Sequence, residues 1–174
     1  QWSACKDGNS FHGFGCEIMV EGKELKIEKI RNGTVIDHVP SGLGLKVLKI
    51  LHMDEDINTS VFLGIHVPSK KMGFKDIVKI ENRFLAPKEI AKISLIAPSA
   101  TVNKIKDYDI AEKYSVPPPG EVIGIVKCSN PNCVTNLNEP VVTEFRVVLT
   151  NPLRIKCRYC EREMEGKEII HNII

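Results

Sequence analysis

The sequence predicts an α+β protein with two domains, and three observations support this class. Helix-like and strand-like patterns alternate from about residue 24 to residue 116. Three consecutive prolines, Pro117–Pro119, then interrupt both patterns, because proline continues neither a helix nor a central strand. Short strand-like segments and four clustered cysteines follow the prolines. We therefore expect a larger α+β domain and a small all-β domain behind it.

The larger domain, residues 23–116, begins with the pattern of a β-hairpin. Residues 25–30 and 34–39 have the alternation expected of strands. Asn32-Gly33 lies between them, and this dipeptide favours tight turns. The two segments are therefore expected to pair with each other.

Two helices and further strands are expected after this hairpin. Apolar residues recur at helical spacing in residues 43–51, with Ser41 as the expected N-cap, and again in residues 87–97, with Pro87 at the helix start. Strand patterns lie in residues 59–67, 74–85 and 101–110, the last of which closes in an exposed turn. This order predicts a ferredoxin-like fold, in which two helices cover one face of an antiparallel sheet.

The smaller domain, residues 122–174, follows a proline-rich linker at residues 117–121. Its sequence has little helical periodicity and contains short strand patterns in residues 122–128, 141–149, 153–157 and 166–174. A small zinc-ribbon-like, all-β fold is expected.

Four cysteines in this domain have the spacing of a metal site. Cys128 and Cys133 are separated by four residues, Cys157 and Cys160 by two, and 23 residues separate the pairs. Each pair supplies two thiolates from one turn, and a tetrahedral ion needs two such pairs. We expect one structural Zn²⁺ ion, with iron as the alternative metal. A redox C-x-x-C motif would not need the second pair, and a disulfide framework is typical of shorter, secreted chains.

Composition and charge exclude several classes of protein. The formal charge of the 174-residue chain is +2, and the smaller domain has seven basic and seven acidic residues from residue 121 onward, so no nucleic-acid partner is expected. No apolar run reaches the ~20 residues of a membrane span, and no secretory pattern is visible. We expect a cytoplasmic protein without a membrane partner.

Residues 1–22 form an extension without a periodic pattern. They are expected to be disordered or foreign to the native chain, because Met19 would make a natural start.

The larger domain offers candidate ligand-binding residues but no catalytic set. Adjacent Asp37 and His38 would lie on opposite faces of a regular strand, so they are not expected to form a pair. Lys79 lies inside an apolar strand, where a lysine needs a partner or an anionic ligand, and Lys113 is a third basic candidate. No Gly-rich phosphate loop and no triad pattern is present, so the sequence gives no convincing catalytic set.

Several long stretches together resemble one known family. NGTVIDHVPSG, MGFKDIVKIENRFL, APSATVNKI and the four-cysteine pattern with its CRYCE segment look like the regulatory chain of aspartate carbamoyltransferase. The likeness runs in order from about Leu25 to the C-terminus.

The resemblance implies a non-catalytic subunit of pyrimidine biosynthesis. In that family an allosteric domain binds nucleotides, and a zinc domain docks onto catalytic chains. Regulatory chains pair as dimers through their allosteric domains and bridge catalytic trimers. CTP inhibits, together with UTP in some members, and ATP usually activates.

The resemblance also implies a role for each matching position. Asp37 and Lys79 would contact the ribose, and His38 and Lys113 the phosphates. The base would be read by the backbone of Lys29, Ile30, Ile105 and Tyr108. The pocket would be lined by Glu28, Val35 and Ile110. Ile27 is the remaining matched position. Cys128, Cys133, Cys157 and Cys160 match the zinc ligands. Lys29 and the charged segment 106–113 depart from the family pattern, so the sign of each nucleotide effect does not follow.

Two other functions fit parts of the chain. A zinc-ribbon protein that binds nucleic acid would show steep salt dependence, and its smaller domain would carry a basic excess that this chain lacks. An iron redox carrier of the rubredoxin type would be coloured and redox-active.

Overall fold

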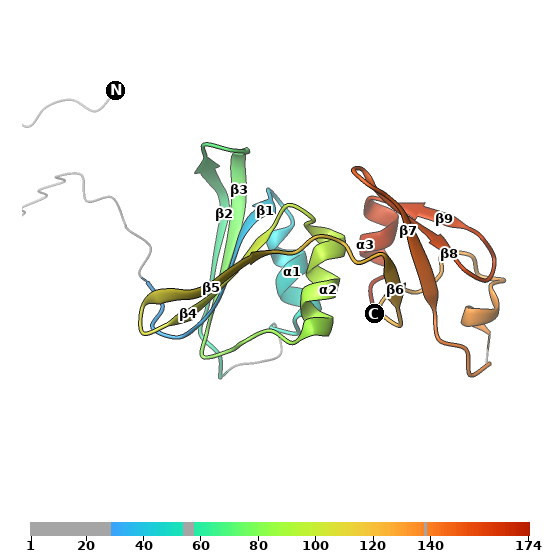
Figure 1. Ribbon diagram of the computed structural model, residues 1–174, viewed down its shortest axis with the longest axis horizontal. Helices are drawn as coiled ribbons and strands as arrows, with labels where there is room; N and C mark the ends of the chain where they lie inside the picture. The colour runs from blue at the N-terminus through green and yellow to red at the C-terminus, as the bar shows by residue number, and fades with distance from the viewer. Residues whose placement is uncertain (1–28, 54–57, 138) are drawn as a thin grey trace, which may run out of the picture.

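The computed structural model describes residues 29–53, 58–137 and 139–174. The described chain forms two antiparallel sheets side by side, each with its own apolar core (Figure 1). The predicted α+β class is confirmed. No helix in the described part of the chain is long and apolar enough to cross a membrane.

The first sheet has five strands in the order β2-β3-β1-β4-β5. Its first four strands have the ferredoxin-like order, and β5 extends one edge. The strands are β1 (Gly33–Pro40), β2 (Val61–Ser69), β3 (Gly73–Glu81), β4 (Thr101–Lys106) and β5 (Asp109–Ser115).

Two helices cover one face of this sheet, as predicted. They are α1 (Gly44–Ile50) and α2 (Pro87–Ile96). Their apolar sides pack on Ile36, Val78 and Val102 of the three central strands, which are fully buried. Because successive strand residues point to opposite faces, the residues next to these three lie on the face that the helices leave open (Figure 1).

The expected hairpin of residues 25–30 and 34–39 is wrong. Strand β1 pairs with β3 on one side and with β4 on the other, so both of its edges are occupied by other strands; residues 25–28 of the expected partner lie outside the described residues. The Asn32-Gly33 turn is still needed, because Gly33 has a φ of +137° and a Cβ there would collide with the carbonyl oxygen of Ile80. The dipeptide does mark a turn, but the partner strand comes from a distant segment.

The expected N-cap at Ser41 is also wrong. Leu43 precedes the first residue of α1 and gives no side-chain cap, whereas the Ser41 hydroxyl lies 3.0 Å from Nδ1 of His66. The buried carboxylate of Asp76 caps the loop instead. It accepts hydrogen bonds from the backbone of Gly42, Gly44 and His66 at 2.8 to 2.9 Å.

Strand β5 extends the sheet beyond the predicted exposed turn. The turn itself is present at Asp107 and Tyr108, both with positive φ. The chain then pairs again with β4 over residues that alternate poorly in polarity, because β5 is an edge strand exposed along most of its length.

The second sheet has the order β6-β7-β8-β9. Its strands are β6 (Glu121–Ile123), β7 (Glu144–Thr150), β8 (Leu153–Cys157) and β9 (Glu163–Glu165), with a 3-10 turn at Val134–Asn136. The strand predicted for residues 166–174 is wrong, because Lys167–His171 form a short helix, α3. Its apolar residues and those just after it, Ile169, Ile170 and Ile173, serve both cores, which a strand with one buried face could not do.

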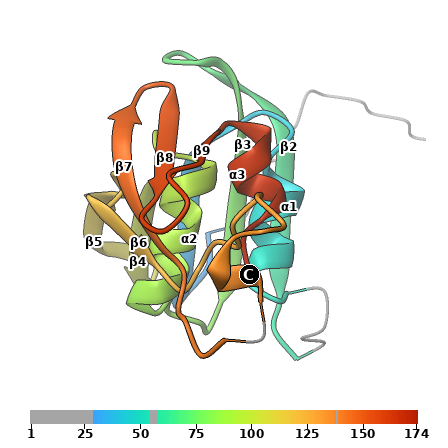
Figure 2. The same cartoon turned by 90° about the vertical axis from the view of Figure 1, so that its right-hand side faces the viewer.

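The two cores meet at helices α2 and α3 (Figures 1 and 2). Leu95 of α2 is 3% exposed and belongs to the second core, whereas its neighbours Ile93 and Ile96 belong to the first. Ile170 and Ile173 pack in the opposite direction, from the end of the chain onto the first core. Apolar packing therefore joins the two halves in addition to the proline-rich segment.

Candidate functional site

A pocket of about 640 Å³ lies on the open face of the first sheet. Strands β1, β3 and β4 form its floor, and the β4–β5 turn forms one wall. The lining residues are Lys29, Ile30, Val35, Lys79, Asn103, Ile105, Tyr108, Asp109 and Ile110. Seven of these nine positions are among the residues expected to bind a nucleotide.

The register of the strands places the central residues of this site side by side in one cross-strand row. Val35 of β1 is paired with Lys79 of β3 on one side and with Asn103 of β4 on the other. The row continues outward to Phe62, the partner of Lys79, and to Lys113, the partner of Asn103. One cross-strand row thus spans all five strands and brings two lysines from distant segments to the same face.

The wall of the pocket is held by contacts between two backbone segments. The amide of Tyr108 donates to the carbonyl of Arg31 at 2.9 Å, and the amide of Asp107 donates to the Asn32 side chain at 3.2 Å. The segment after residue 28 therefore lies against the β4–β5 turn, and residues of both segments line the same pocket.

Asp37 and His38 do contact each other, contrary to the sequence expectation. Their side chains lie 3.2 Å apart, and the His38 amide donates to the Asp37 carboxylate at 2.7 Å. The reason is a bulge in β1 between Ile36 and Val39, where His38 has a φ of 60° and strand alternation is broken. A regular strand would have separated the two side chains.

Lys75 completes this group. Its ammonium lies 2.7 Å from the Asp37 carboxylate, which is largely shielded from solvent. Burial acts to raise the pKa of Asp37, but the hydrogen bonds from Lys75 and from the His38 backbone outweigh it and hold the pKa below its usual value. Asp37 is thus an anion that orients neighbouring cations.

Lys79 is the most confined of the pocket cations. Burial lowers the pKa of its ammonium group. The ammonium lies 5.8 Å from the centre of the Phe62 ring, close enough for a cation–π contact. A partly desolvated cation interacts more strongly with an anionic or strongly polar ligand than a solvated one does.

Two polar residues of the site were missed from the sequence. Asn103 is 7% exposed, and its Oδ1 finds no donor among the described residues. Its amide Nδ2 lies 3.5 Å from the carbonyl of Val35. A buried acceptor without a partner is unfavourable unless a ligand supplies a donor. The signal was present as a lone asparagine in a strand pattern; Asp109, by contrast, gave no signal.

Some expected positions lie away from the pocket or outside the described chain. Asp37, His38 and Lys113 do not line it, although each lies on β1 or β5 within a few residues of a lining residue. Ile27 and Glu28 fall outside the described residues, as does the whole extension 1–22.

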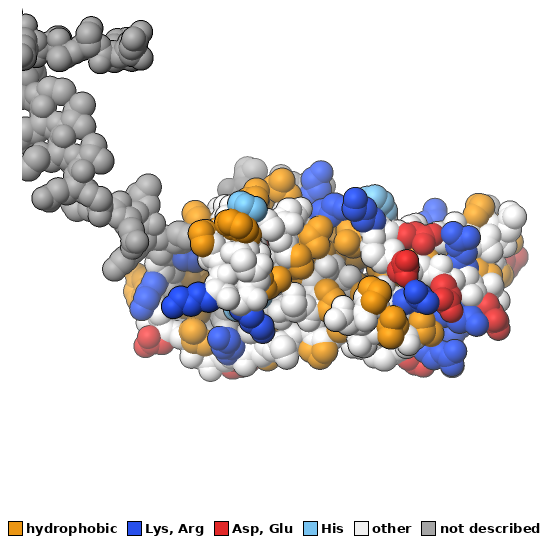
Figure 3. All heavy atoms as spheres, turned by 90° about the horizontal axis from the view of Figure 1, so that it is seen from above, with side chains coloured by type: hydrophobic (Ala, Val, Ile, Leu, Met, Phe, Trp, Pro, Cys, Tyr) orange, Lys and Arg blue, Asp and Glu red, His pale blue; other side chains and the backbone are white. Residues whose placement is uncertain are grey.

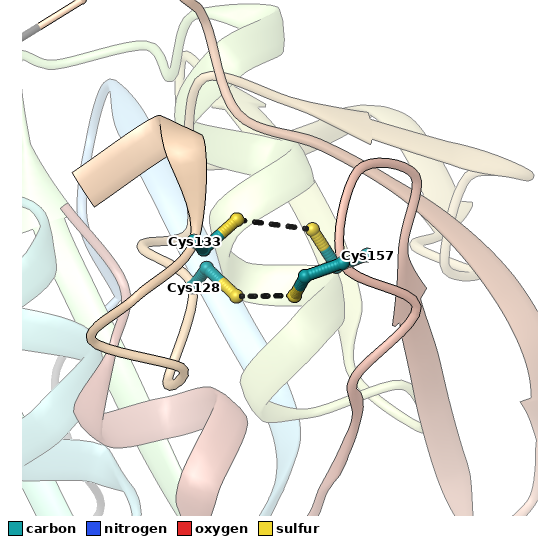
Figure 4. A group of neighbouring side chains, drawn as sticks. Cys128, Cys133 and Cys157 are labelled. Carbon is teal, nitrogen blue, oxygen red and sulfur yellow. Dashed lines mark hydrogen bonds between the residues drawn. The ribbon is translucent and has the colours of Figure 1, made fainter. Parts of the chain in front are cut away.

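The four predicted metal ligands form one cluster in the second domain. Figure 4 shows Cys128 and Cys133 facing Cys157, with their thiols pointing inward. Cys160, which follows Cys157 in the same turn, is the fourth member of the cluster. All four sulfur atoms lie within 4.8 Å of one another. The Cys128–Cys160 and Cys133–Cys157 sulfur pairs are 3.5 and 3.8 Å apart. Zn–S bonds of about 2.3 Å place tetrahedral sulfurs about 3.8 Å apart, so the cluster fits zinc.

The protein supports these thiols with hydrogen bonds. The Thr135 hydroxyl donates to the Cys133 sulfur at 3.2 Å, and the Asn136 amide closes the first loop by donating to two backbone carbonyls at 2.7 Å. Burial raises the pKa of Cys128. Burial also acts to raise the pKa of Cys160, but hydrogen bonds led by the Arg162 backbone outweigh it and lower the pKa to about 6. Bound metal stabilises all four as thiolates, and the closed cage leaves no position for a substrate.

Charges on the second domain are mixed rather than basic. In Figure 3 acidic and basic side chains alternate over the right-hand part, which is this domain. Ion pairs on this surface include Arg154–Glu165, Lys156–Glu161, Arg158–Glu144 and Arg162–Glu168. Such a surface does not have the basic excess of a nucleic-acid face.

Fold and sites together define a class of protein. A sheet with a ligand-sized pocket, lined by no catalytic set among the described residues, is joined through a shared helix pair to a domain built around a structural zinc ion. The class that these features define is a two-domain protein with one ligand-sized pocket and one separate structural metal centre.

Comparison with known proteins identifies the family. A family model for the aspartate carbamoyltransferase regulatory chain, allosteric domain, matches residues 25–117, and one for the metal binding domain of that chain matches residues 120–170. The regulatory chain of Thermoplasma acidophilum is 58% identical over 147 residues, which cover 84% of this chain and 97% of that one. The regulatory chain of Thermococcus onnurineus is 53% identical over 150 residues, covering 86% and 99%. The chain belongs to the family of aspartate carbamoyltransferase regulatory chains.

Proposed function

We propose that the open-face pocket binds nucleotide effectors and that the chain passes their effect to aspartate carbamoyltransferase catalytic trimers. CTP and UTP act as inhibitors and ATP as an activator of pyrimidine synthesis in the cytoplasm. The observation that supports this proposal is the cross-strand row of Lys79, Val35, Asn103 and Lys113: Lys79 and the unsatisfied oxygen of Asn103 line the pocket, and Lys113 is the strand partner of Asn103 on β5.

The geometry supports a division of the pocket along its length. The apolar end at Ile30, Ile105 and Ile110, with Tyr108, suits a base, whose edge is read by backbone groups. The Asn103 oxygen suits a donor on the base or the ribose. Outside the pocket lining, Lys113 on β5 and Lys75 near the bulge supply positive charge for phosphates, and the His38 ring can donate a hydrogen bond to them, since a triphosphate carries about four negative charges at neutral pH.

Selectivity among bases follows from hydrogen bonding. A base that presents a carbonyl where the pocket offers an acceptor leaves two acceptors facing each other, at a cost of about 1–3 kcal/mol. CTP and ATP both carry an exocyclic amino group, and UTP does not. UTP is therefore expected to bind less tightly than CTP at this pocket.

A calorimetric titration with CTP, followed by competition with ATP, tests the nucleotide site. Saturable binding of both at one site is expected, and a Lys79→Ala Lys113→Ala double variant should lose it. Lys71→Ala is the matched control, because Lys71 is exposed at the β2–β3 tip outside the pocket. Equal CTP affinity in the double variant and the control would disprove the site.

We further propose that the zinc domain docks onto the catalytic chain through an exposed apolar cluster. Ile123 and Val142 are each more than half exposed, and the Tyr159 hydroxyl donates to the carbonyl of Val142, which places Tyr159 beside it. Apolar side chains grouped with the Arg158 ion pairs are typical of a protein interface. A Val142→Asp variant should lose association with catalytic trimers yet retain zinc. The control variant Leu45→Asp, on α1, should retain both association and zinc.

A dimer through the edge of the first sheet is the third part of the proposal. Strand β2 is an edge strand, so one row of its backbone groups is unpaired, and it exposes Phe62 and Ile65. Pairing with β2 of a second copy would continue the sheet. Analytical ultracentrifugation should show a dimer for the natural sequence and a monomer for Ile65→Lys, with Leu45→Lys as the control.

A further inference from the structure

A groove separates the two halves of the molecule on the side where α2 and α3 do not hold them together. Its volume is about 440 Å³. Three segments line it: Pro98 and Ser99 after α2, Pro117 and Pro118 of the linker, and Thr150 and Asn151 at the tip of the β7–β8 hairpin. Figure 1 shows these segments converging above α2 and α3.

The wall of the groove that belongs to the first domain is hydrogen-bonded to His38, the residue proposed to contact the phosphates. The Ser99 hydroxyl donates to the carbonyl of His38 at 3.3 Å. The Thr101 hydroxyl lies 3.5 Å from Nδ1 of His38. The amide of Val116 donates to the carbonyl of Ala100 at 3.4 Å, which joins the linker to the same loop. His38, the loop after α2 and the linker therefore form one connected unit.

The opposite wall belongs entirely to the zinc domain. Thr150 and Asn151 sit at the hairpin tip, and no hydrogen bond is found between them and residues 98–101 or 116–118 in the described chain. The tight contact between the halves is the apolar packing of Leu95 with the second core and of Ile170 and Ile173 with the first. Because the two domains are packed together at α2 and α3 and are open at the groove, the angle between them can change about the α2–α3 contact.

We propose that Ser99 transmits the occupancy of the nucleotide pocket to the width of this groove, with the α2–α3 contact as the pivot. The inference rests on the proposed nucleotide function and adds the route by which that site reaches the zinc domain. A phosphate bound at His38 competes with Thr101 and with Asp37, whose carboxylate lies 3.2 Å from the same ring nitrogen. His38 lies in the bulge of β1, where no residue of β3 or β4 is its register partner, so a phosphate that pulls on its ring can displace the whole residue, including its carbonyl. Because Ser99 is bonded to that carbonyl, the loop that walls the groove follows.

Two ligands can act in opposite directions through this device only if they differ in their contacts at His38. A nucleotide shifts the equilibrium between two groove widths by its difference in affinity for them, and a ligand that binds both equally shifts nothing. Ser99 is thus a positioning residue, since it acts through His38 and does not line the nucleotide pocket.

Hydrogen exchange measured on the complete complex with catalytic trimers tests the route. Saturating CTP should change exchange by at least threefold in the peptide that contains Thr150 and Asn151, although this hairpin lies in the other domain. Ser99→Ala should abolish that change while calorimetric CTP affinity stays within threefold. Ser99→Thr keeps the hydroxyl and should restore it.

Each outcome separates this inference from the proposed function. CTP binding with an unchanged hairpin, or a hairpin response that persists in Ser99→Ala, overturns the route and leaves the nucleotide site intact. No CTP binding to the natural sequence overturns both. A merely structural role of Ser99 would alter thermal stability and CTP affinity in Ser99→Ala without a selective loss at the hairpin.

A groove-filling substitution gives an independent check. Thr150→Trp should occupy the groove and fix its width, so the effects of CTP and ATP on the activity of the complex should fall to within about 1.5-fold of unity. Zinc content and CTP affinity should match those of Thr150→Ser, which leaves the groove open. Undiminished nucleotide effects in a zinc-loaded Thr150→Trp complex would contradict the inference.

Discussion

His38 illustrates how one backbone angle decides the chemistry of a site. With a φ of 60°, it turns strand β1 into a bulge and brings its ring next to Asp37, which a regular strand would have kept on the other face. The sequence indicated that both residues were candidates. It could not indicate that they act together, because the bulge depends on the register that β1 adopts with β3.

The pH dependence of stability should report on Asp37. Its pKa is lowered in the folded chain, so its contribution is fully present above the unfolded value of about 4 and is lost as the pH falls through the folded value. At pH 7, Asp37→Asn should be less stable by about 1 kcal/mol. The difference between the two proteins in urea unfolding should shrink below pH 4.

Zinc loss at low pH affects the natural sequence and Asp37→Asn equally, so it cancels in this difference. A difference that stayed constant from pH 7 to pH 3 would show that the carboxylate is not stabilised by Lys75 and the His38 backbone.

Gly33 should tolerate no side chain. A Cβ would meet the carbonyl oxygen of Ile80, and the backbone is in a region that L-residues avoid, so Gly33→Ala should cost about 2 kcal/mol or more. Gly73 also has a positive φ but has open space around it, so Gly73→Ala should cost about 1 kcal/mol. Gly120→Ala should be close to neutral, because its Cβ would meet open space and its φ is not positive. Thermal unfolding of the three variants would test this order, and equal effects would contradict it.

At the scale of elements, Asp76 shows that a loop can be capped from a distant strand. Its carboxylate, fully buried on β3, accepts three backbone amide hydrogen bonds, two from the loop that leads into α1 and one from the bulge in β2. Ser41 looked like the cap because it is adjacent in sequence. A buried carboxylate with three donors is the stronger acceptor, and the serine pairs with His66 instead.

Removing this cap should loosen α1 and the β2 bulge together. Asp76→Ala leaves three buried amides without an acceptor and should cost about 3 kcal/mol or more. Asp76→Asn keeps one carbonyl oxygen and should cost less. Amide hydrogen exchange at Gly42, Gly44 and His66 should accelerate in both, most in Asp76→Ala; protected amides there in the alanine variant would refute the cap.

At the scale of the whole molecule, the two halves share a structural element. Helix α2 contributes Ile93 and Ile96 to the first core and Leu95 to the second, and α3 packs back on the first. Metal binding in the second domain is therefore expected to stabilise the first as well, since the second core must be formed for Leu95 to stay buried.

Cys157→Ala should release zinc and unfold the second domain. It should also lower the unfolding temperature of the first domain, because α2 loses its packing against the second core. Released zinc can be followed with a metallochromic dye, and the two domains by calorimetry. A domain that kept its metal and its fold would show that four thiolates are not required.

The Leu95→Ala variant distinguishes the effect of α2 packing from the effect of metal loss. The truncation should cost about 2–5 kcal/mol and lower the unfolding temperatures of both domains while zinc stays bound. Ile90→Ala, on the same helix, packs on the first core and should affect the first domain alone. Independent unfolding of the two domains in Leu95→Ala and the natural sequence alike would contradict the shared core.

Local sequence patterns were sufficient to predict the α+β class, the positions of α1, α2 and most strands, and the four metal ligands. These features depend on periodicity, on turn residues and on spacing between neighbouring cysteines, all of which are properties of short segments. The patterns also pointed to Lys79, because a lysine inside an apolar strand needs a partner or an anionic ligand.

The pairing and packing of those segments with one another were decided only by the tertiary structure. The register of β1 between β3 and β4 excluded the expected hairpin, aligned Lys79 with Asn103 and Lys113, and created the bulge that joins Asp37 to His38. Residues 167–171, predicted as part of a strand, form helix α3. Through α2 and α3 the cores of the two domains are in contact, although the sequence predicted two separate cores. Long-range pairing and packing are selected by the free energy of the whole fold, and no short segment carries that information.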